Sequence, residues 1–135
     1  MRYLIDTNVF IKMVTDTVSE ETLKITRDYE NLIYISSASI TEYLHLVQNE
    51  KVIPKKEFRT LDVFDLVENI FGFQVKYVAK EHLRTFAKLD LIEGHNDPND
   101  RLIIAQALTE KMPVISSDKK FPKYRKMGLE LIFNE

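Results

Sequence analysis

The chain has 135 residues, about the size of one domain, and is 44% hydrophobic and 30% charged, as in an ordinary globular protein. It contains no cysteine, which excludes disulfide bonds, zinc–thiolate sites and thiol nucleophiles. A net charge of −2 argues against binding of nucleic acid by bulk charge, although a local basic surface is compatible with this total.

The N-terminus lacks the features of a secretory signal. Asp6 follows two aliphatic residues, so no apolar run of about 7–15 residues forms there. No apolar run elsewhere approaches the roughly 18 residues needed to span a bilayer. The sequence therefore predicts a cytoplasmic protein without a membrane partner, which the lack of cysteine also fits.

The hydrophobic pattern predicts short strands that alternate with helices. Strands are expected over residues 2–5, 32–36, 73–78, 113–117 and 129–133. Helices are expected over 8–14, 19–30, 40–47, 64–71, 83–91 and 98–111, with a basic connection over 50–59. The helix 98–111 is apolar nearly all round and should be buried against a sheet. This alternation is typical of a single α/β layered domain with a largely parallel sheet.

Four carboxylates fall where such a sheet places its sites, at the carboxyl ends of strands. Asp6 and Asp118 directly follow the first and fourth predicted strands. Glu42 and Asp100 are expected in the first turns of the helices at 40–47 and 98–111. If these helices run antiparallel to the strands, all four side chains meet at one rim.

Each acid also has a purely structural interpretation. Asp6, Asp97 and Asp118 could cap helices or turns, and Asp97 before Pro98 is a good N-cap. Ser39 to Glu42 matches a capping box, in which Glu42 would fold back onto its own helix. Taken together, however, four clustered like charges suppress ionisation unless cations lie between them. Acidic oxygens without cysteine favour one or two Mg²⁺ or Mn²⁺ ions, and phosphodiester hydrolysis is the chemistry that uses them most naturally.

At these residues the sequence resembles the PIN-domain nucleases, and in particular VapC toxins. The four matching segments, in order, are 6–9 (DTNV), 39–42 (SITE), 97–107 (DPNDRLIIAQA) and 115–118 (ISSD), and the resemblance extends from residue 1 to about 133. It implies a single PIN-like domain over 1–135, a three-layer α/β/α fold with a five-stranded parallel sheet in the order 3-2-1-4-5.

The resemblance also implies roles. Asp6, Glu42, Asp100 and Asp118 would be the catalytic acids that bind metal, with Asp97 as an accompanying acid. Asn8 would orient Asp6, and Ser116 or Ser117 would hydrogen-bond within the pocket. The implied function is the endoribonuclease toxin of a toxin–antitoxin pair, with RNA as substrate, a cognate antitoxin and a homodimer as partners. Two features depart from the family pattern. Asn99 stands where an apolar, often aromatic residue is commoner, and the fourth motif carries serine where threonine is frequent.

A basic run follows the last acid: Lys119, Lys120, Lys123, Arg125 and Lys126. It could steer phosphates toward the metal pocket, with Phe121 and Tyr124 stacking on bases, or be a solvated turn over buried aromatics. Arg101 could likewise contact a phosphate or only balance the acidic rim. The three histidines, His45, His82 and His95, are interpreted as structural or surface residues.

Three other functions remain open. An aspartate-based phosphatase would use Asp6 as nucleophile, but the general acid expected two residues later is Asn8. A non-catalytic interaction module of the same fold would use its acids only as caps. DNA could replace RNA, because carboxylate–metal chemistry needs no 2′-hydroxyl.

Overall fold

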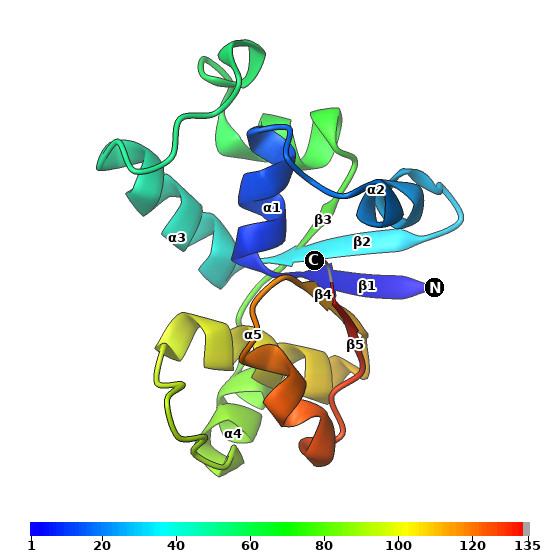
Figure 1. Ribbon diagram of the computed structural model, residues 1–135, viewed down its shortest axis with the longest axis vertical. Coiled ribbons are helices and arrows are strands. Elements are labelled where there is room, and N and C mark those ends of the chain that lie inside the picture. The colour runs from blue at the N-terminus through cyan, green and yellow to red at the C-terminus, as the bar shows by residue number, and fades with distance from the viewer. Residues whose placement is uncertain (134–135) are drawn as a thin grey trace.

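The computed structural model, which describes residues 1–133, is built on a parallel sheet with the strand order β3-β2-β1-β4-β5 (Figure 1). The strands are β1 (Arg2–Ile5), β2 (Leu32–Ser36), β3 (Gln74–Lys76), β4 (Val114–Ser116) and β5 (Leu131–Phe133). All four neighbouring pairs are parallel. The predicted fold class and strand order are therefore confirmed.

Helices cover both faces of this sheet. They are α1 (Thr7–Val14), α2 (Glu20–Arg27), α3 (Ser37–Gln48), α4 (Lys80–Lys88) and α5 (Pro98–Glu110), with short helical segments η1 (Lys56–Phe58), η2 (Asp65–Ile70) and η3 (Phe121–Met127). In Figure 1, α1, α2 and α3 lie above the sheet, and α4, α5 and η3 lie below it. The result is a three-layer α/β/α sandwich.

The alternation of side chains along the strands divides the core into two halves. Tyr3 and Ile5 pack with α1 and α3 on one face, while Leu4 packs with α5 and η3 on the other. Both faces are apolar because a parallel sheet is covered on both sides. Ile103 and Ile104, successive residues of α5, are both completely buried, as the all-round apolar pattern predicts.

The start of α3 differs from the prediction. Ser36 is the N-cap, and its hydroxyl accepts a hydrogen bond from the Ala38 N–H at 3.0 Å. Ser39 therefore lies inside the helix, and Glu42 lies in its second turn instead of its first. The predicted capping box is wrong, because an earlier serine at the end of β2 already caps this helix.

The segment after α4 also differs. The helix ends at Lys88 and does not extend to residue 91, so Leu91 lies outside it and is 78% exposed. The chain instead turns at Gly94, whose φ of +80° favours glycine, and Ile92 and His95 form an isolated antiparallel bridge. This turn brings residue 95 back toward the start of α5.

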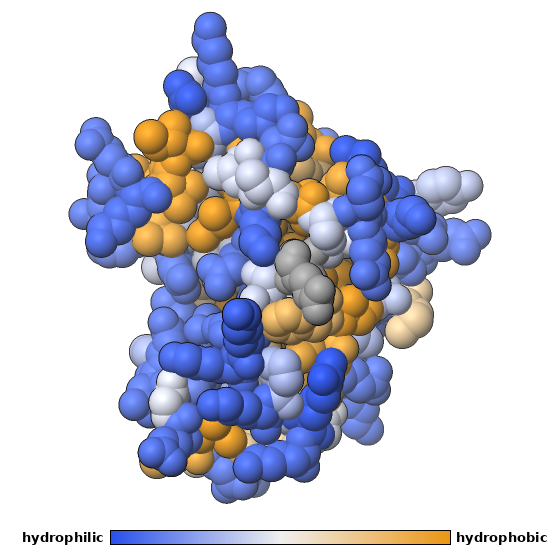
Figure 2. Space-filling model, in the orientation of Figure 1, coloured by the Kyte–Doolittle hydropathy of each residue, from blue (hydrophilic) through white to orange (hydrophobic). Residues whose placement is uncertain are grey.

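The visible face is hydrophilic over most of α4, α5 and η3, whereas hydrophobic side chains gather at the upper left, over α3 and the connection after it (Figure 2). Within residues 1–133, no helix combines the length and apolarity that crossing a membrane requires.

Candidate metal centre

Asp6 anchors the site at the junction of β1 and α1. It is the N-cap of α1, and its Oδ1 accepts a hydrogen bond from the Val9 N–H at 2.9 Å. Its Oδ2 accepts a hydrogen bond from the Ser116 hydroxyl at 2.5 Å. Because β1 and β4 are neighbours, the end of one strand thus fixes the acid at the end of the other. Asp6 is only 1% exposed, so this carboxylate is rigidly held inside the protein.

Glu42 comes from the neighbouring helix, α3. In Figure 1, α1 and α3 begin close together at the ends of β1 and β2, and the Thr7 hydroxyl donates a hydrogen bond to Ser39 Oγ at 3.0 Å. Among the described residues, Glu42 Oε2 is buried and has no hydrogen-bond partner. A buried carboxylate oxygen of this kind needs a partner, and a cation would provide one.

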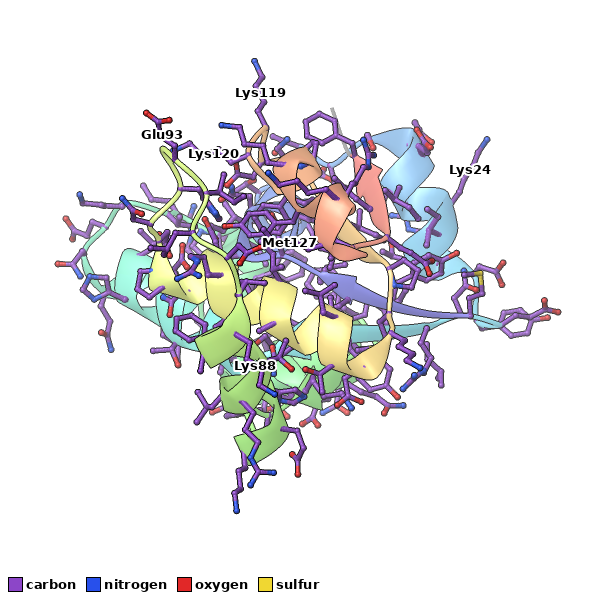
Figure 3. All side chains as sticks on the ribbon, turned by 90° about the horizontal axis from the view of Figure 1, so that it is seen from below. Lys24, Lys88, Glu93, Lys119, Lys120 and Met127 are labelled. Carbon is purple, nitrogen blue, oxygen red and sulfur yellow. The ribbon has the colours of Figure 1, made fainter. Side chains whose placement is uncertain are left out.

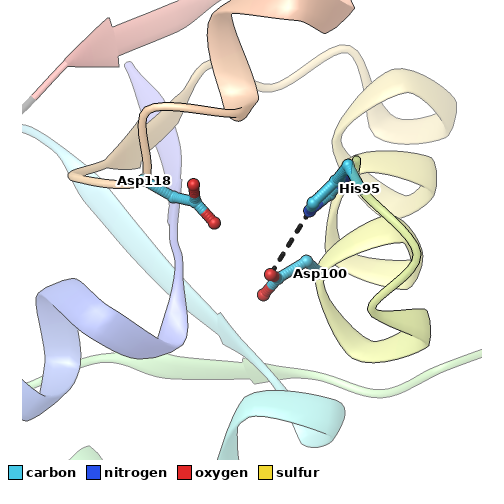
Figure 4. A group of neighbouring side chains, drawn as sticks. All are labelled: His95, Asp100 and Asp118. Carbon is cyan, nitrogen blue, oxygen red and sulfur yellow. Dashed lines mark hydrogen bonds and ion pairs between the residues drawn. The ribbon is translucent and has the colours of Figure 1, made fainter. Parts of the chain in front are cut away.

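Asp100 and Asp118 complete the group from the other side of the sheet. Asp97 caps α5, and its Oδ1 accepts hydrogen bonds from the N–H groups of Asn99 and Asp100 at 2.9 and 3.2 Å. This cap places Asp100 in the first turn. The Asp118 N–H donates to Ser116 Oγ at 3.0 Å, so Ser116 contacts two of the acidic residues. Figure 4 shows the Asp118 side chain facing Asp100 across the pocket.

The electrostatics of the site reflect the meeting of these acids. Burial, with smaller contributions from the charges of Asp118 and Glu42, raises the pKa of Asp6 from 3.8 to about 6. Burial and the charges of Asp97, Asp118, Glu42 and Asp6 raise the pKa of Asp100 to about 7. Burial and the Asp97 charge also raise the pKa of Glu42, whereas hydrogen bonds with Asn99 and Thr7 act in the opposite direction. Acids from β1, α3, α5 and the end of β4 therefore interact in one pocket.

This donor set fits a divalent cation. The ligands on offer are carboxylate oxygens, which Mg²⁺ and Mn²⁺ prefer, and the chain has no thiolate. A cation would offset both the burial and the mutual repulsion that raise these pKa values, and it would give Glu42 Oε2 a partner. Asp6, Glu42, Asp100 and Asp118 are therefore the residues that could hold it, with Asp97 at the edge.

Sequence reasoning missed His95. One of its ring nitrogens and single carboxylate oxygens of Asp100 and Asp118 all lie within 4.8 Å of one another (Figure 4). The prediction of a structural or surface role holds better for the other histidines, since His45 is exposed and His82 pairs with Glu110 at 2.9 Å. The only signal in the sequence is that His95 lies just before the third acidic motif.

Several predicted site residues lie elsewhere or do something else. Asn8 is exposed, and the hydrogen bonds of Asp6 described above come from Val9 and Ser116. Arg101 is 9% exposed and donates a hydrogen bond to the Leu89 carbonyl at 3.1 Å, which favours charge balance over direct contact with RNA. Ser117 is half-buried next to Ser116.

The basic run after Asp118 is exposed, but its aromatic residues are not. Lys119 and Lys120 project into solvent at the same edge of the molecule in Figure 3, and Lys123, Arg125 and Lys126 are also exposed. Phe121 and Tyr124 are fully buried, so the prediction that they stack on bases is wrong. They are core residues of η3, which packs beneath the sheet.

A cavity of about 560 Å³ lies away from the four acids, between α2 and the segment around η2. Its lining mixes apolar residues with charged ones, including Leu23, Phe58, Phe71, Asp16 and Lys55. None of the carboxylates of the metal centre contributes to it. The cavity is therefore separate from the metal centre.

Comparisons with known proteins agree with this fold. The model of the PIN domain family matches residues 3–127. No curated protein matches the chain at a significant level. A chain of VapBC2 from Rickettsia felis, bound to a promoter DNA fragment, is similar over 100% of both chains, with 19% identity and a TM-score of 0.73.

Two further solved structures share the fold. A chain of DNA-bound VapBC from Salmonella typhimurium is 15% identical, with 98% of both chains covered and a TM-score of 0.69. A chain of FitAcB from Neisseria gonorrhoeae is 15% identical, with 98% of this chain and 96% of that chain covered and a TM-score of 0.63.

Proposed function

Because the chain belongs to the PIN domain family, we propose that it is a divalent-metal-dependent endoribonuclease, the VapC-type toxin of a toxin–antitoxin pair. One observation carries the proposal: acids from four separate segments meet in one buried pocket, where burial first and their mutual charges second raise the pKa of Asp6 to about 6 and of Asp100 to about 7. Such a pocket is unfavourable without a cation and fits one well.

In this proposal Asp6, Glu42, Asp100 and Asp118 hold one or two Mg²⁺ or Mn²⁺ ions. When bound, the cation stabilises charge on the phosphate and lowers the pKa of the attacking water. Ser116 keeps Asp6 in place through its hydroxyl and, through the Asp118 N–H, ties the loop after β4 to the same point. A carboxylate of this group positions the attacking water and accepts its proton.

The exposed lysines beside Asp118 would bring RNA to the pocket. Lys119 and Lys120 follow this acid directly and project from one edge (Figure 3). Their charge attracts the phosphate backbone without reading sequence. The buried aromatic residues of η3 cannot stack on bases, so selection of RNA rests on other contacts.

An antitoxin is the partner we expect. One structure of similar fold, VapBC-5 from Mycobacterium tuberculosis, is described as a member of the VapBC family of toxin–antitoxin systems. We extend this to the present chain, together with a cytoplasmic location and a homodimer. Co-expression with a short neighbouring reading frame, followed by co-purification and measurement of the mass of the complex, tests this part.

Two alternatives involve no nuclease chemistry, namely an interaction module of the same fold and an aspartate-based phosphatase. An interaction module would need the acids only as caps, and Asp6 and Asp97 do cap helices. Glu42, however, lies in the second turn of α3 with a buried oxygen that has no hydrogen bond among the described residues, which a capping role does not explain. A phosphatase would need a general acid at position 8, where Asn8 stands.

The test is incubation of purified protein with total RNA, or with single-stranded DNA, and either Mg²⁺ or Mn²⁺. We expect discrete RNA fragments that disappear with EDTA and in Asp100→Asn, and that persist in Asp90→Asn, a matched change at an exposed acid. If only DNA is cut in a metal-dependent way, DNA and not RNA is the substrate. Cleavage that survives both EDTA and Asp100→Asn would not come from this site.

A further inference from the structure

His95 is a buried polar residue at the edge of the metal centre to which the proposed chemistry gives no role. Its side chain is 2% exposed. Its two ring nitrogens contact different partners: Nδ1 lies 2.6 Å from the Tyr124 hydroxyl, and Nε2 lies 3.4 Å from Asp100 Oδ2. Figure 4 shows the second contact, with the imidazole edge directed at the Asp100 carboxylate.

The imidazole ring is held rigidly between two elements. The turn at Gly94 and the Ile92–His95 bridge fix its backbone just before α5. Rings from η3 pack against it edge-on, with centroid distances of 5.3 Å to Tyr124 and 6.1 Å to Phe121. A ring confined in this way presents one fixed nitrogen to Asp100.

The Tyr124 hydroxyl sets the direction of the hydrogen bonds. It is fully buried, and among the hydrogen bonds of residues 1–133 its partner is His95 Nδ1. The O–H group needs an acceptor, and an imidazole nitrogen that carries no proton provides one.

The opposite direction leaves a buried group unsatisfied. If Nδ1 carried the proton and donated to Tyr124, the tyrosine O–H would have no acceptor among the hydrogen bonds of residues 1–133. A buried unpaired hydroxyl costs about 1–3 kcal/mol. Neutral His95 therefore accepts at Nδ1 and carries its proton on Nε2, the nitrogen that faces Asp100.

We propose that His95 is a positioning residue, which acts through Asp100 as the last donor of a hydrogen-bond chain from Tyr124 through His95 to this carboxylate. The inference rests on the proposed metal-dependent function. The N–H of His95 holds Asp100 Oδ2 on one side and leaves the other oxygen to face the pocket. Outer contacts of this kind typically change metal affinity about 10- to 100-fold when removed.

The hydrogen-bond chain predicts which variants lose Mn²⁺ affinity. Tyr124→Phe keeps the ring and removes only the hydroxyl that fixes the tautomer. His95→Gln keeps an amide donor near the position of Nε2, whereas His95→Leu removes it. We expect Mn²⁺ affinity to fall about 10-fold in Tyr124→Phe and His95→Leu, and to fall less in His95→Gln. His45→Gln, a change at an exposed histidine, should bind Mn²⁺ as the wild type does.

Two measurements on the full chain test this inference: the ¹⁵N chemical shifts of His95 in the metal-free protein, and calorimetric titration with MnCl₂. The expected shifts are those of a neutral ring protonated at Nε2, with a mixture of tautomers in Tyr124→Phe. Thermal unfolding identifies any variant that fails to fold. If the His95 variants do not fold, Mn²⁺ binding by Tyr124→Phe still tests the inference.

A ring protonated at Nδ1, or wild-type Mn²⁺ affinity in folded Tyr124→Phe, would overturn the inference while leaving the nuclease proposal intact. A wild-type protein that binds no Mn²⁺ would overturn both.

Discussion

Ser116 and Asp6 lie 110 residues apart in the chain, yet the Ser116 hydroxyl donates a hydrogen bond to Asp6 Oδ2 at 2.5 Å. The same oxygen of Ser116 accepts the N–H of Asp118 at 3.0 Å. One small buried side chain thus fixes two of the four acids, because parallel pairing puts the ends of β1 and β4 side by side.

Substitution of Ser116 should weaken metal binding. Ser116→Ala removes the donor to Asp6 and the acceptor for Asp118 while leaving the strand intact. We expect Mn²⁺ affinity to fall about 10-fold, measured by calorimetric titration. Ser117→Ala, at the half-buried neighbour, should change it little. Equal effects of the two changes would show that the hydroxyl of Ser116 has no special role.

The metal-free protein should lose stability as pH rises. Asp6 and Asp100 have folded-state pKa values of about 6 and about 7, above the ordinary value of 3.8. The folded state therefore binds these protons more tightly than the unfolded state. Their stabilising effect is complete below about pH 3.8 and is lost as pH rises through 6 and 7. In EDTA, the unfolding temperature should be lower at pH 8 than at pH 5. In Mn²⁺, this decrease in unfolding temperature at pH 8 should be reversed.

Other groups titrate over this range, so a variant is needed to isolate the effect. Asp100→Asn removes the charge repulsion at α5, and in EDTA at pH 8 it should unfold at a higher temperature than the wild type. With Mn²⁺ the order should reverse, because only the wild type gains the metal. If Asp100→Asn is less stable than the wild type in EDTA at pH 8, charge repulsion at Asp100 does not destabilise the metal-free protein.

Metal binding should release protons below neutral pH. At pH 6, Asp100 is mostly protonated and Asp6 about half protonated, and both must ionise to bind a cation. Calorimetric titrations at pH 6 in two buffers of different ionisation enthalpy give the number of protons released. We expect this number to fall toward zero at pH 8. Proton release that is the same at both pH values would argue against these two ligands.

The lysines beside Asp118 should set the salt dependence of RNA binding. In the Asp100→Asn background, replacing Lys119 or Lys120 with alanine should weaken binding of any RNA sequence and reduce the slope of log affinity against log salt by about 1 each. Lys88→Ala is the matched control, because Figure 3 places Lys88 at the opposite side of the molecule. An unchanged slope in all three variants would place the RNA elsewhere.

The sequence predicted the sheet well for a physical reason. Strands β1, β2 and β4 are buried on both faces, so they read as short apolar runs, and Asp6 and Asp118 follow two of them directly. Parallel topology then brings the strand ends to one edge. Pro98 after Asp97 likewise fixed the start of α5, and the structure has the same N-cap.

Other features depend on tertiary contacts that local patterns do not carry. His95 contacts Tyr124 only because a turn packs against η3. No periodic pattern in the sequence around either residue indicates this contact. The burial of Arg101 depends on the Leu89 carbonyl and on the Phe86 ring, which lies 5.1 Å from the guanidinium. The start of α3 was missed because Ser36 and Ser39 are equally plausible caps until the end of β2 is known.

The most direct test of the metal centre is calorimetric titration of MnCl₂ into wild-type protein and Glu42→Gln at pH 8. Glu42 caps no helix, so a metal ligand is the role that best explains its buried, unpartnered oxygen among the described residues. We predict clear binding to the wild type, lost or weakened at least about 10-fold in Glu42→Gln, and retained in Glu68→Gln at an exposed site. Equal binding by wild type and Glu42→Gln, or no binding by either, would contradict a metal centre built on these acids.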